Sequence, residues 1–349
     1  HNKGDGTFAD VTKKALGKTS WGAIGSKAFD YDNDGRLDLL IVDMHSDMWV
    51  PSTRDTHMAE EIAQKYAHKK FRGVTGPTSA YSSTADQREA VMADMFKIKY
   101  NEVLFGNTLF HNLGGGRFEE VSDKAGMETF WPWGIATGDF DNDGYEDVFL
   151  PSGMGYPWFY WPNSLMMNNG NGTFTDRAAT DGIEPPAGGI YQREEVEDEP
   201  APRSSRCAAV ADFDGDGRLD IVVNNFNSPA YYFKNQFPRK NYIAFRLEGT
   251  QCNRDAIGAV VKLYAGKRLM VRQVNPAGGY LSQSSKTVHF GLGDTKTVDR
   301  VEIFWPGQKK PEVIAHPTVN KLTTIVQPRK LGLQPTGVSA IASRSRMGG

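Results

Sequence analysis

An aspartate-rich stretch of nine residues occurs three times in this chain, and it limits the possible folds more than any other feature. The copies are DYDNDGRLD at 30–38, DFDNDGYED at 139–147 and DFDGDGRLD at 212–220, called loops 1, 2 and 3 below. Each copy has aspartate at positions 1, 3, 5 and 9 and glycine at position 6, and an apolar run follows it. Carboxylates spaced this closely repel one another strongly unless a cation lies among them.

The spacing is typical of a calcium-binding loop. Ca²⁺ takes six to eight oxygen ligands at about 2.3–2.6 Å, which alternate aspartates and the main-chain carbonyl at position 7 can supply. Glycine at position 6 permits a turn with positive φ around the ion. A solvated aspartate-rich turn is the alternative for one copy, but three copies with the same internal glycine favour three Ca²⁺ sites. The expected side-chain ligands are Asp30, Asp32, Asp34, Asp38, Asp139, Asp141, Asp143, Asp147, Asp212, Asp214, Asp216 and Asp220. The expected main-chain ligands are the carbonyl oxygens of Arg36, Tyr145 and Arg218.

Only the first half of each loop follows the EF-hand pattern. The glutamate that an EF-hand carries at position 12 is replaced by Ile41, Leu150 and Val223. Because these residues belong to apolar runs rich in β-branched side chains, we expect a strand rather than a helix to leave each loop.

A larger repeat surrounds the loops. Segments 1–12 (HNKGDGTFADVT), 111–122 (HNLGGGRFEEVS) and 167–178 (MNNGNGTFTDRA) share a glycine-rich turn, a phenylalanine and a short polar segment. Short strands and turn signals that recur in this way are typical of propeller blades. The units resemble FG-GAP repeats, also called VCBS repeats, and WPWG at 131–134 with the stretch 138–157 is similar to the cartilage acidic protein 1 family. This resemblance implies a calcium-binding propeller of seven blades.

About three blades can be counted, so we expect a partial propeller that other residues or another polypeptide complete. After Pro238 the pattern changes to alternating strands without a helix between them. The motifs NRDAIGA, GGYLSQSS, HFGLG and VEIFWPG in this part resemble the ASPIC/UnbV domain. The predicted fold is therefore mainly β: propeller blades at 1–237, a small sandwich-like β domain at 238–328 and a tail at 329–349.

Two insertions interrupt the blades. The segment 51–106 has apolar side chains at helical spacing and is predicted to form two helices across one propeller face, and 184–203 is an acidic loop. Between them, YPWFYWP contains consecutive aromatic residues, which cannot all face one core if the segment is extended. Trp158, Tyr160 and Trp161 are therefore candidates for a ligand or partner contact; burial beneath the inserted helices is the alternative.

Several functional classes lack support in the sequence. The formal net charge of −2 offers no polybasic surface for nucleic acid, and three bound Ca²⁺ ions would reverse its sign. No run of 18 apolar residues predicts a membrane span. No GxSxG, HExxH or phosphate-loop motif predicts an enzyme, and His45 between Asp43 and Asp47 is better explained as structural. Cys207 and Cys252 are interpreted as separate thiols rather than a disulfide.

These features predict an extracellular, cell-surface or periplasmic calcium-binding propeller that acts as a binding, adhesion or scaffold module. Its expected partner is a protein or glycan ligand, or neighbouring subunits that complete the propeller. One alternative is an accessory subunit of a larger extracellular or periplasmic assembly. Another is a polysaccharide-active enzyme with a polar pocket at the propeller face, around Asp43, His45 and Tyr156.

Overall fold

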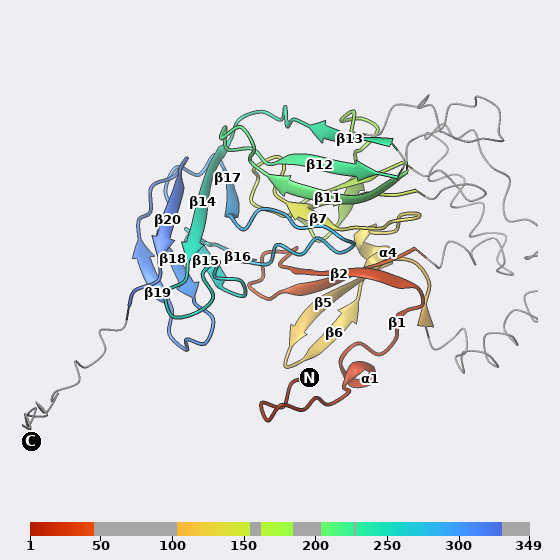
Figure 1. Ribbon diagram of the computed structural model, residues 1–349, viewed down its shortest axis with the longest axis horizontal. Coiled ribbons are helices and arrows are strands. Elements are labelled where there is room, and N and C mark those ends of the chain that lie inside the picture. Colours follow the sequence, from red (N-terminus) through yellow and green to blue (C-terminus); the bar gives the residue numbers. More distant parts are fainter. Residues whose placement is uncertain (45–102, 154–161, 184–203, 227, 330–349) are drawn as a thin grey trace, which may run out of the picture.

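The computed structural model describes residues 1–44, 103–153, 162–183, 204–226 and 228–329 (Figure 1). The regular structure consists almost entirely of short strands, and three antiparallel sheets, called blades 1, 2 and 3, stack in chain order. Blade 1 consists of β2 (Ala23–Phe29), β3 (Asp38–Asp43), β5 (Thr108–Gly114) and β6 (Arg117–Glu120). Blade 2 consists of β7 (Ala136–Gly138), β8 (Asp147–Leu150), β9 (Ser164–Asn168) and β10 (Phe174–Asp176). Blade 3 consists of β11 (Ser205–Ala211), β12 (Asp220–Asn225) and β13 (Ser228–Phe233).

Short elements precede or follow the strands of blade 1. They are the helices α1 (Thr12–Ala15) and α4 (Ser122–Ala125) and the parallel pair β1 (Thr19–Ser20) and β4 (Val103–Leu104). Each aspartate loop joins the first two strands of a blade: loop 1 joins β2 to β3, loop 2 joins β7 to β8, and loop 3 joins β11 to β12. The strand predicted to leave each loop is confirmed, and it begins at position 9 in all three copies.

The blades stack because their strands are apolar on the faces that meet. Blade 2 lies between the other two, and β8 (DVFL) is accordingly buried along its whole length. One core cluster joins blade 1 to blade 2 through Leu40, Leu109 and Val148, and a second joins blade 2 to blade 3 through Phe149 and Ile221. In an extended strand successive side chains point to opposite faces, so the three consecutive apolar residues at 148–150 fit a sheet covered on both sides.

The C-terminal domain is a sandwich of two sheets that share one hydrophobic core. Its first sheet has the order β17 (Val288–Gly293), β14 (Asn241–Glu248), β20 (Leu322–Val326). Its second sheet has the order β16 (Arg268–Gln273), β15 (Val260–Ala265), β18 (Arg300–Phe304), β19 (Glu312–Ala315). Trp305 is completely buried in this core, and its indole Nε1 donates a hydrogen bond of 2.8 Å to Glu312.

A connecting segment of the C-terminal domain, residues 274–287, runs along the first strands of the blades (Figure 1). Lys27 on β2 donates hydrogen bonds of 2.8 Å to the carbonyls of Asn275 and Ala277. Ile135, just before β7, donates to Gly278, and Ser285 donates to Val210 on β11. The segment therefore contacts all three blades and holds the C-terminal domain against them.

The prediction of a mainly β chain is confirmed. Cys207 and Cys252 are unpaired, as expected, but both are only half-buried. The helices predicted within 51–106, the acidic loop 184–203 and the aromatic residues Trp158, Tyr160 and Trp161 lie outside the described residues, apart from 103–106. In the described part of the chain, no helix has the length and apolar character needed to cross a membrane.

Candidate metal centres

The three aspartate loops share one backbone frame, built around the aspartate at position 1. In loop 2, Asp139 Oδ1 accepts a hydrogen bond of 2.9 Å from the N–H of Asp143, and its Oδ2 accepts one of 2.8 Å from the N–H of Gly144. Asp30 and Asp212 accept the matching pair of bonds in loops 1 and 3. The glycine at position 6 has φ between 89° and 104° in the three loops, as predicted. Only a residue that tolerates positive φ can close this turn.

The aspartate at position 9 fastens each loop to the neighbouring strand. In loop 2, Asp147 accepts hydrogen bonds from the N–H of Phe140 at position 2 (2.9 Å) and from the N–H of Asn168 on β9 (2.8 Å). The Asn168 side-chain amide then donates to the carbonyl of Glu146 at position 8 (3.1 Å). Loops 1 and 3 repeat this arrangement with equivalent asparagines. These bracing asparagines are Asn112, Asn168 and Asn235.

The aspartates at positions 3 and 5 are more exposed and pair with cationic side chains. Lys240 lies 3.0 Å from Asp141, and Lys234 lies 2.7 Å from Asp214. Arg36 pairs with Asp34 in loop 1. The four carboxylates of a loop are therefore of two kinds: positions 1 and 9 support the fold, and positions 3 and 5 face outward.

Burial sets the electrostatics of the position 1 aspartates. Asp30 and Asp139 are 0% and 1% exposed, and burial raises the pKa of each from 3.8 to about 7, with neighbouring carboxylates adding to the rise. The pKa of Asp38 at position 9 rises to about 6, also mainly through burial. Within the described residues no lysine or arginine forms an ion pair with a position 1 aspartate. A divalent cation beside them would favour the ionised form and remove this cost.

Loop 3 is the most exposed of the three. Its position 1 aspartate, Asp212, has a pKa raised by burial, whereas hydrogen bonds from Lys234 and Arg218 lower the pKa values of Asp214 and Asp216. Loops 1 and 2 therefore carry the larger desolvation penalty and have more to gain from a bound ion.

The donor atoms in each loop lie close enough for one ion to contact several of them. Groups whose ligand atoms lie within 4.8 Å of one another are Asp30, Asp32 and Asp34 in loop 1, Asp139, Asp141 and Asp147 in loop 2, and Asp212, Asp214 and Asp216 in loop 3. These residues fit Ca²⁺, a hard cation that prefers carboxylate oxygens. The other expected side-chain ligands, Asp38, Asp143 and Asp220, are not members of these three groups. The main-chain carbonyl ligands expected at position 7 remain predictions.

Two functions of the loops were not anticipated from the sequence. The residue at position 4 has a left-handed backbone in every loop, with φ of 59° at Asn33, 57° at Asn142 and 76° at Gly215. The two asparagines donate across to the next blade: Asn33 to the carbonyl of Gly144 (3.1 Å) and Asn142 to that of Gly217 (3.0 Å). Asparagine tolerates left-handed φ better than most residues, so Asn33 and Asn142 could have indicated a left-handed turn at position 4.

The bracing asparagines also link the blades, in the reverse direction. Asn168 of blade 2 donates to the carbonyl of Tyr31 in loop 1, and Asn235 of blade 3 donates to that of Phe140 in loop 2, each at 2.7 Å. The rings of Tyr31 and Phe140 at position 2 are 5% and 2% exposed beneath the following blade, whereas the equivalent Phe213 of loop 3 is 53% exposed.

The C-terminal domain contacts loops 2 and 3 directly. Gly291 donates a hydrogen bond of 2.9 Å from its N–H to Asp139 Oδ2, and Arg272 donates one of 3.1 Å to the carbonyl of Gly144. His289 Nε2 lies 3.1 Å from the carbonyl of Gly217, so Nε2 carries the proton. Burial lowers the pKa of His289 to about 4, which keeps the ring neutral at physiological pH.

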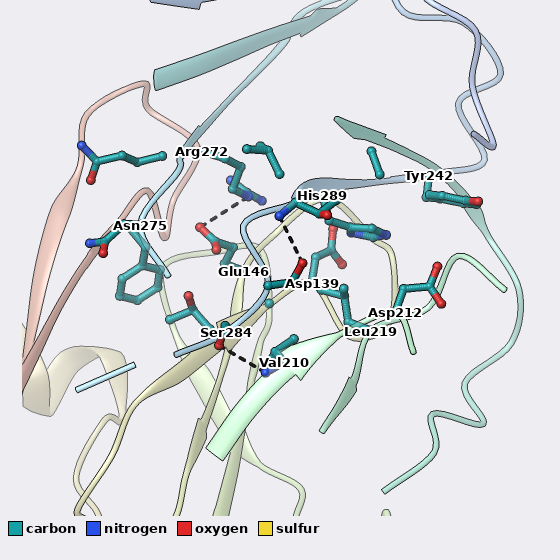
Figure 2. A pocket seen from close by; sticks show the side chains of 18 of the residues that line it. Asp139, Glu146, Val210, Asp212, Leu219, Tyr242, Arg272, Asn275, Ser284 and His289 are labelled. Carbon is teal, nitrogen blue, oxygen red and sulfur yellow. Dashed lines mark hydrogen bonds and ion pairs between the residues drawn. The ribbon is translucent and has the colours of Figure 1, made fainter. Parts of the chain in front are cut away.

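A cavity of about 420 Å³ lies between the blades and the C-terminal domain (Figure 2). Its lining includes Asp139 and Asp212 from the loops and Arg272 and His289 from the C-terminal domain. Figure 2 shows Arg272 beside Glu146, with Arg272 Nε 3.4 Å from Glu146 Oε2. The loops and the C-terminal domain thus form one connected polar region.

Comparison with protein families identifies both parts of the chain. A family model described as FG-GAP-like repeat matches residues 1–41 and 93–150, and one described as ASPIC and UnbV matches residues 249–331. The chain thus contains segments similar to FG-GAP-like repeats and to the ASPIC and UnbV domain. The resemblance inferred from the loop and strand motifs is thereby confirmed. FG-GAP-like repeats fold as propeller blades, which agrees with the stacked sheets; a ring of seven is not established by the blades described.

Proteins similar to part of this chain include cartilage acidic protein 1. The protein of Xenopus tropicalis is 34% identical over 118 residues, which cover 34% of this chain and 15% of the relative. The Mus musculus and Homo sapiens proteins are 32% and 31% identical over 111 residues, which cover 32% of this chain and 14% of each relative. The match thus spans about one seventh of each relative's length.

Proposed function

We propose that the FG-GAP-like repeats bind Ca²⁺ in the three aspartate loops and that the ions make the blades a rigid platform for recognition outside the cell. The observation that carries this proposal is the position 1 aspartate of loop 2. Asp139 is almost completely buried, accepts hydrogen bonds from three backbone N–H groups and has two further carboxylates within 4.8 Å. A carboxylate in such a place is stable in its ionised form when a cation shares the loop.

Calcium would act through the frame of each loop. The ion would draw the position 3 carboxylate toward the buried position 1 carboxylate and so fix the turn that starts the second strand of the blade. Because Asp139 also binds Gly291 of the ASPIC and UnbV domain, ion binding in loop 2 would support the docking of that domain as well. We expect the bound ions to create a rigid surface that holds partner-binding loops in place.

The function is assigned to binding and scaffolding rather than to catalysis. FG-GAP-like repeats and the cartilage acidic protein 1 relatives support a secreted or cell-surface location and a protein or glycan partner. The polar pocket considered for an enzyme included Asp43, which lies in the described part of the chain. Asp43 is completely buried, and its Oδ2 accepts a hydrogen bond from the N–H of Gly22.

Calorimetric titration with Ca²⁺ tests the metal assignment. Three ions per chain are expected, and the Asp139→Asn variant is expected to lose one of them. A titration without binding heat and without a thermal shift would contradict the proposal.

A glycan array probed in Ca²⁺ and in EGTA, beside a screen for polysaccharide cleavage, separates a binding module from an enzyme. Retained glycans without cleavage support a binding module.

A second candidate function, membership in a larger assembly, is favoured by the exposed edge of blade 3. Phe213 and Tyr232 are 53% and 52% exposed and pack edge to face with centroids 5.9 Å apart. At the equivalent position in blades 1 and 2, the next blade covers the ring. The surface therefore fits a further FG-GAP-like blade, whichever polypeptide supplies it. Mass measurement during size exclusion tests whether a second copy of this chain covers the surface: self-association that Phe213→Ser reduces supports this source, and a wild-type monomer rejects it.

Calcium binding and protons should compete in loops 1 and 2. Without calcium, the raised pKa values of Asp30 and Asp139 mean that the native state takes up protons below pH 7, so this contribution to stability is lost as pH rises from about 4 to 7. Bound Ca²⁺ requires ionised carboxylates, so the stabilisation that it provides increases as pH rises. The gain in melting temperature from Ca²⁺ over EGTA is therefore expected to be larger at about pH 8 than at about pH 5.5. A gain that is independent of pH would contradict this linkage.

A further inference from the structure

Loop 1 differs from the other two loops in the side chain that lies over its carboxylates. The residue before each bracing asparagine is His111 in blade 1, Met167 in blade 2 and Lys234 in blade 3. Lys234 forms an ion pair with the position 3 aspartate of its loop. Loop 1 has an imidazole at the same place, and an imidazole, unlike an ammonium group, can bind a metal ion.

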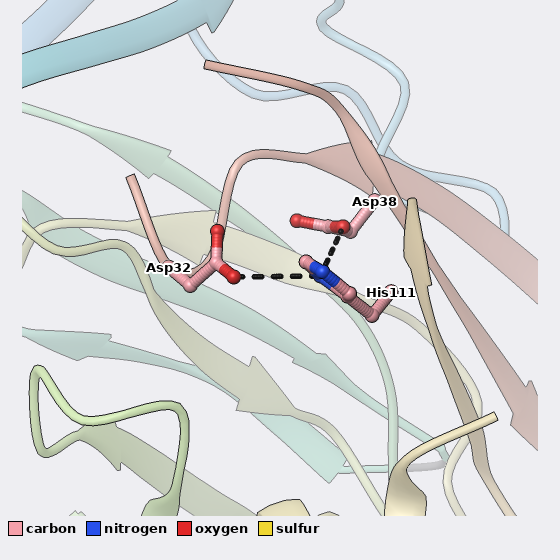
Figure 3. A group of neighbouring side chains, drawn as sticks. All are labelled: Asp32, Asp38 and His111. Carbon is pink, nitrogen blue, oxygen red and sulfur yellow. Dashed lines mark ion pairs between the residues drawn. The ribbon is translucent and has the colours of Figure 1, made fainter. Parts of the chain in front are cut away.

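Figure 3 shows the arrangement of His111 with two aspartates of loop 1. His111 Nδ1 lies 3.4 Å from Asp32 Oδ2 and 3.3 Å from Asp38 Oδ1. The three ligand atoms form a compact group that is distinct from the all-carboxylate group in the same loop, and Asp32 belongs to both. Asp38 comes from the start of β3 and His111 from β5, so the pairing of these two strands fixes the group.

The distances fit a bound ion better than a hydrogen bond. Nδ1 of His111 is buried and has no hydrogen-bond partner. Ligands at about 2.0–2.1 Å from a tetrahedral Zn²⁺ lie about 3.3 Å from one another, which is the separation of Nδ1 from both carboxylate oxygens. An unsatisfied nitrogen held equally far from two oxygens leaves room for one ion between them.

The surroundings also hold the imidazole in this orientation. The ring packs edge to face on Tyr31, with centroids 6.0 Å apart. On the opposite side of the ring, Nε2 lies 3.9 Å from Asp34 Oδ2. This separation is too long for a hydrogen bond, but it places a negative charge beside the second nitrogen.

We propose that loop 1 is a mixed nitrogen and oxygen site for a borderline divalent ion such as Zn²⁺, bound by His111, Asp32 and Asp38. This inference rests on the proposed function in that the ion would share Asp32 and Asp38 with the expected calcium ligands of loop 1. Imidazole suits zinc and other late transition metals, whereas Ca²⁺ prefers an all-oxygen set. Loop 1 therefore discriminates between metals differently from loops 2 and 3, which have no imidazole among their described ligand groups.

The test is a calorimetric titration of the full chain with Zn²⁺ in the presence of saturating Ca²⁺. Two variants introduce the residues of the other blades, His111→Met and His111→Lys, and His316→Asn removes an exposed histidine of the C-terminal domain as a control. The wild type and His316→Asn are expected to bind Zn²⁺ at least tenfold more tightly at one site than the His111 variants. Titration with Co²⁺ should give the intense visible absorption of a tetrahedral site in the wild type and lose it in His111→Met.

Equal Zn²⁺ affinity in the wild type and His111→Met would overturn the inference. Thermal melts in EGTA check that His111→Met folds like the wild type, and Asp32→Asn offers a second, nearly isosteric change that should weaken Zn²⁺ binding. The outcome is separable from the proposed function, because His111→Met should retain three Ca²⁺ ions. Equal Zn²⁺ affinity in the wild type and His111→Met, with calcium binding intact, rejects the mixed site alone, whereas absence of calcium binding in the wild type rejects the calcium assignment.

Discussion

Removal of calcium with EGTA is expected to lower the melting temperature by about 10 °C. An ion that binds the native state at a concentration about 100 times its dissociation constant stabilises it by about 2.7 kcal/mol. A change of 1 kcal/mol shifts the melting temperature by about 2–4 °C for a protein of about 150–250 residues, and up to three sites contribute. Calorimetric melts with Ca²⁺ and with EGTA measure the effect directly, and limited proteolysis should show faster cleavage near the loops without the ion.

Two aspartate variants separate the effect of the bound ion from the effect of the hydrogen bonds in the loop. Asp139→Ala removes both a metal ligand and the acceptor of three backbone N–H groups, so it should destabilise the protein in EGTA as well as in Ca²⁺. Asp214→Ala changes an exposed carboxylate of loop 3 and should matter mainly when calcium is present. Identical melts of the wild type in the two buffers would refute the calcium role.

Replacement of Arg272 by alanine is expected to cost about 3–5 kcal/mol of unfolding free energy. The guanidinium is 5% exposed, donates to Gly144 of loop 2 and forms an ion pair with Glu146, which is itself 9% exposed. Arg272→Ala would leave this buried glutamate without its partner and would remove a link between the C-terminal domain and the blades. Urea unfolding monitored by tryptophan fluorescence measures the loss.

Arg300→Ala is the matched control for this prediction. Its side chain is 43% exposed and pairs with Glu302 on the same strand, an arrangement typically worth less than about 1 kcal/mol. Combining Arg272→Met with Glu146→Gln should recover part of the lost stability, because no charge then stays buried alone. If Arg272→Ala unfolds at the same urea concentration as Arg300→Ala, the buried pair does not hold the domains together.

The sequence predicted those features that depend on local spacing. The aspartates and Gly144 are arranged by nine consecutive residues, so the turn and the strand after it follow from their order alone. The alternation of apolar residues around Val261 and Ile303 likewise predicts strands of a sandwich core. The different tasks of Asp139 and Asp147 were not predicted, because they depend on which backbone N–H groups the neighbouring strand and domain bring to each carboxylate.

Long-range contacts account for what sequence reasoning missed. His111 is distant in the sequence from Asp32 and joins it only through the pairing of β3 with β5. Gly291 reaches Asp139 across 152 positions of the chain, and Arg272 reaches Gly144 across 128. Glycine and histidine in a strand pattern give no sign of such distant partners.

The position 4 asparagines connect the three loops in series. Asn33 donates a hydrogen bond to the turn of loop 2, and Asn142 donates one to the turn of loop 3, in each case to the carbonyl of the glycine that shapes the turn. Ordering of one loop therefore lowers the entropic cost of ordering the next. We expect the ions to load cooperatively, with a Hill coefficient above one that falls toward unity when Asn33 and Asn142 are replaced by glycine, the residue that loop 3 already carries at this position.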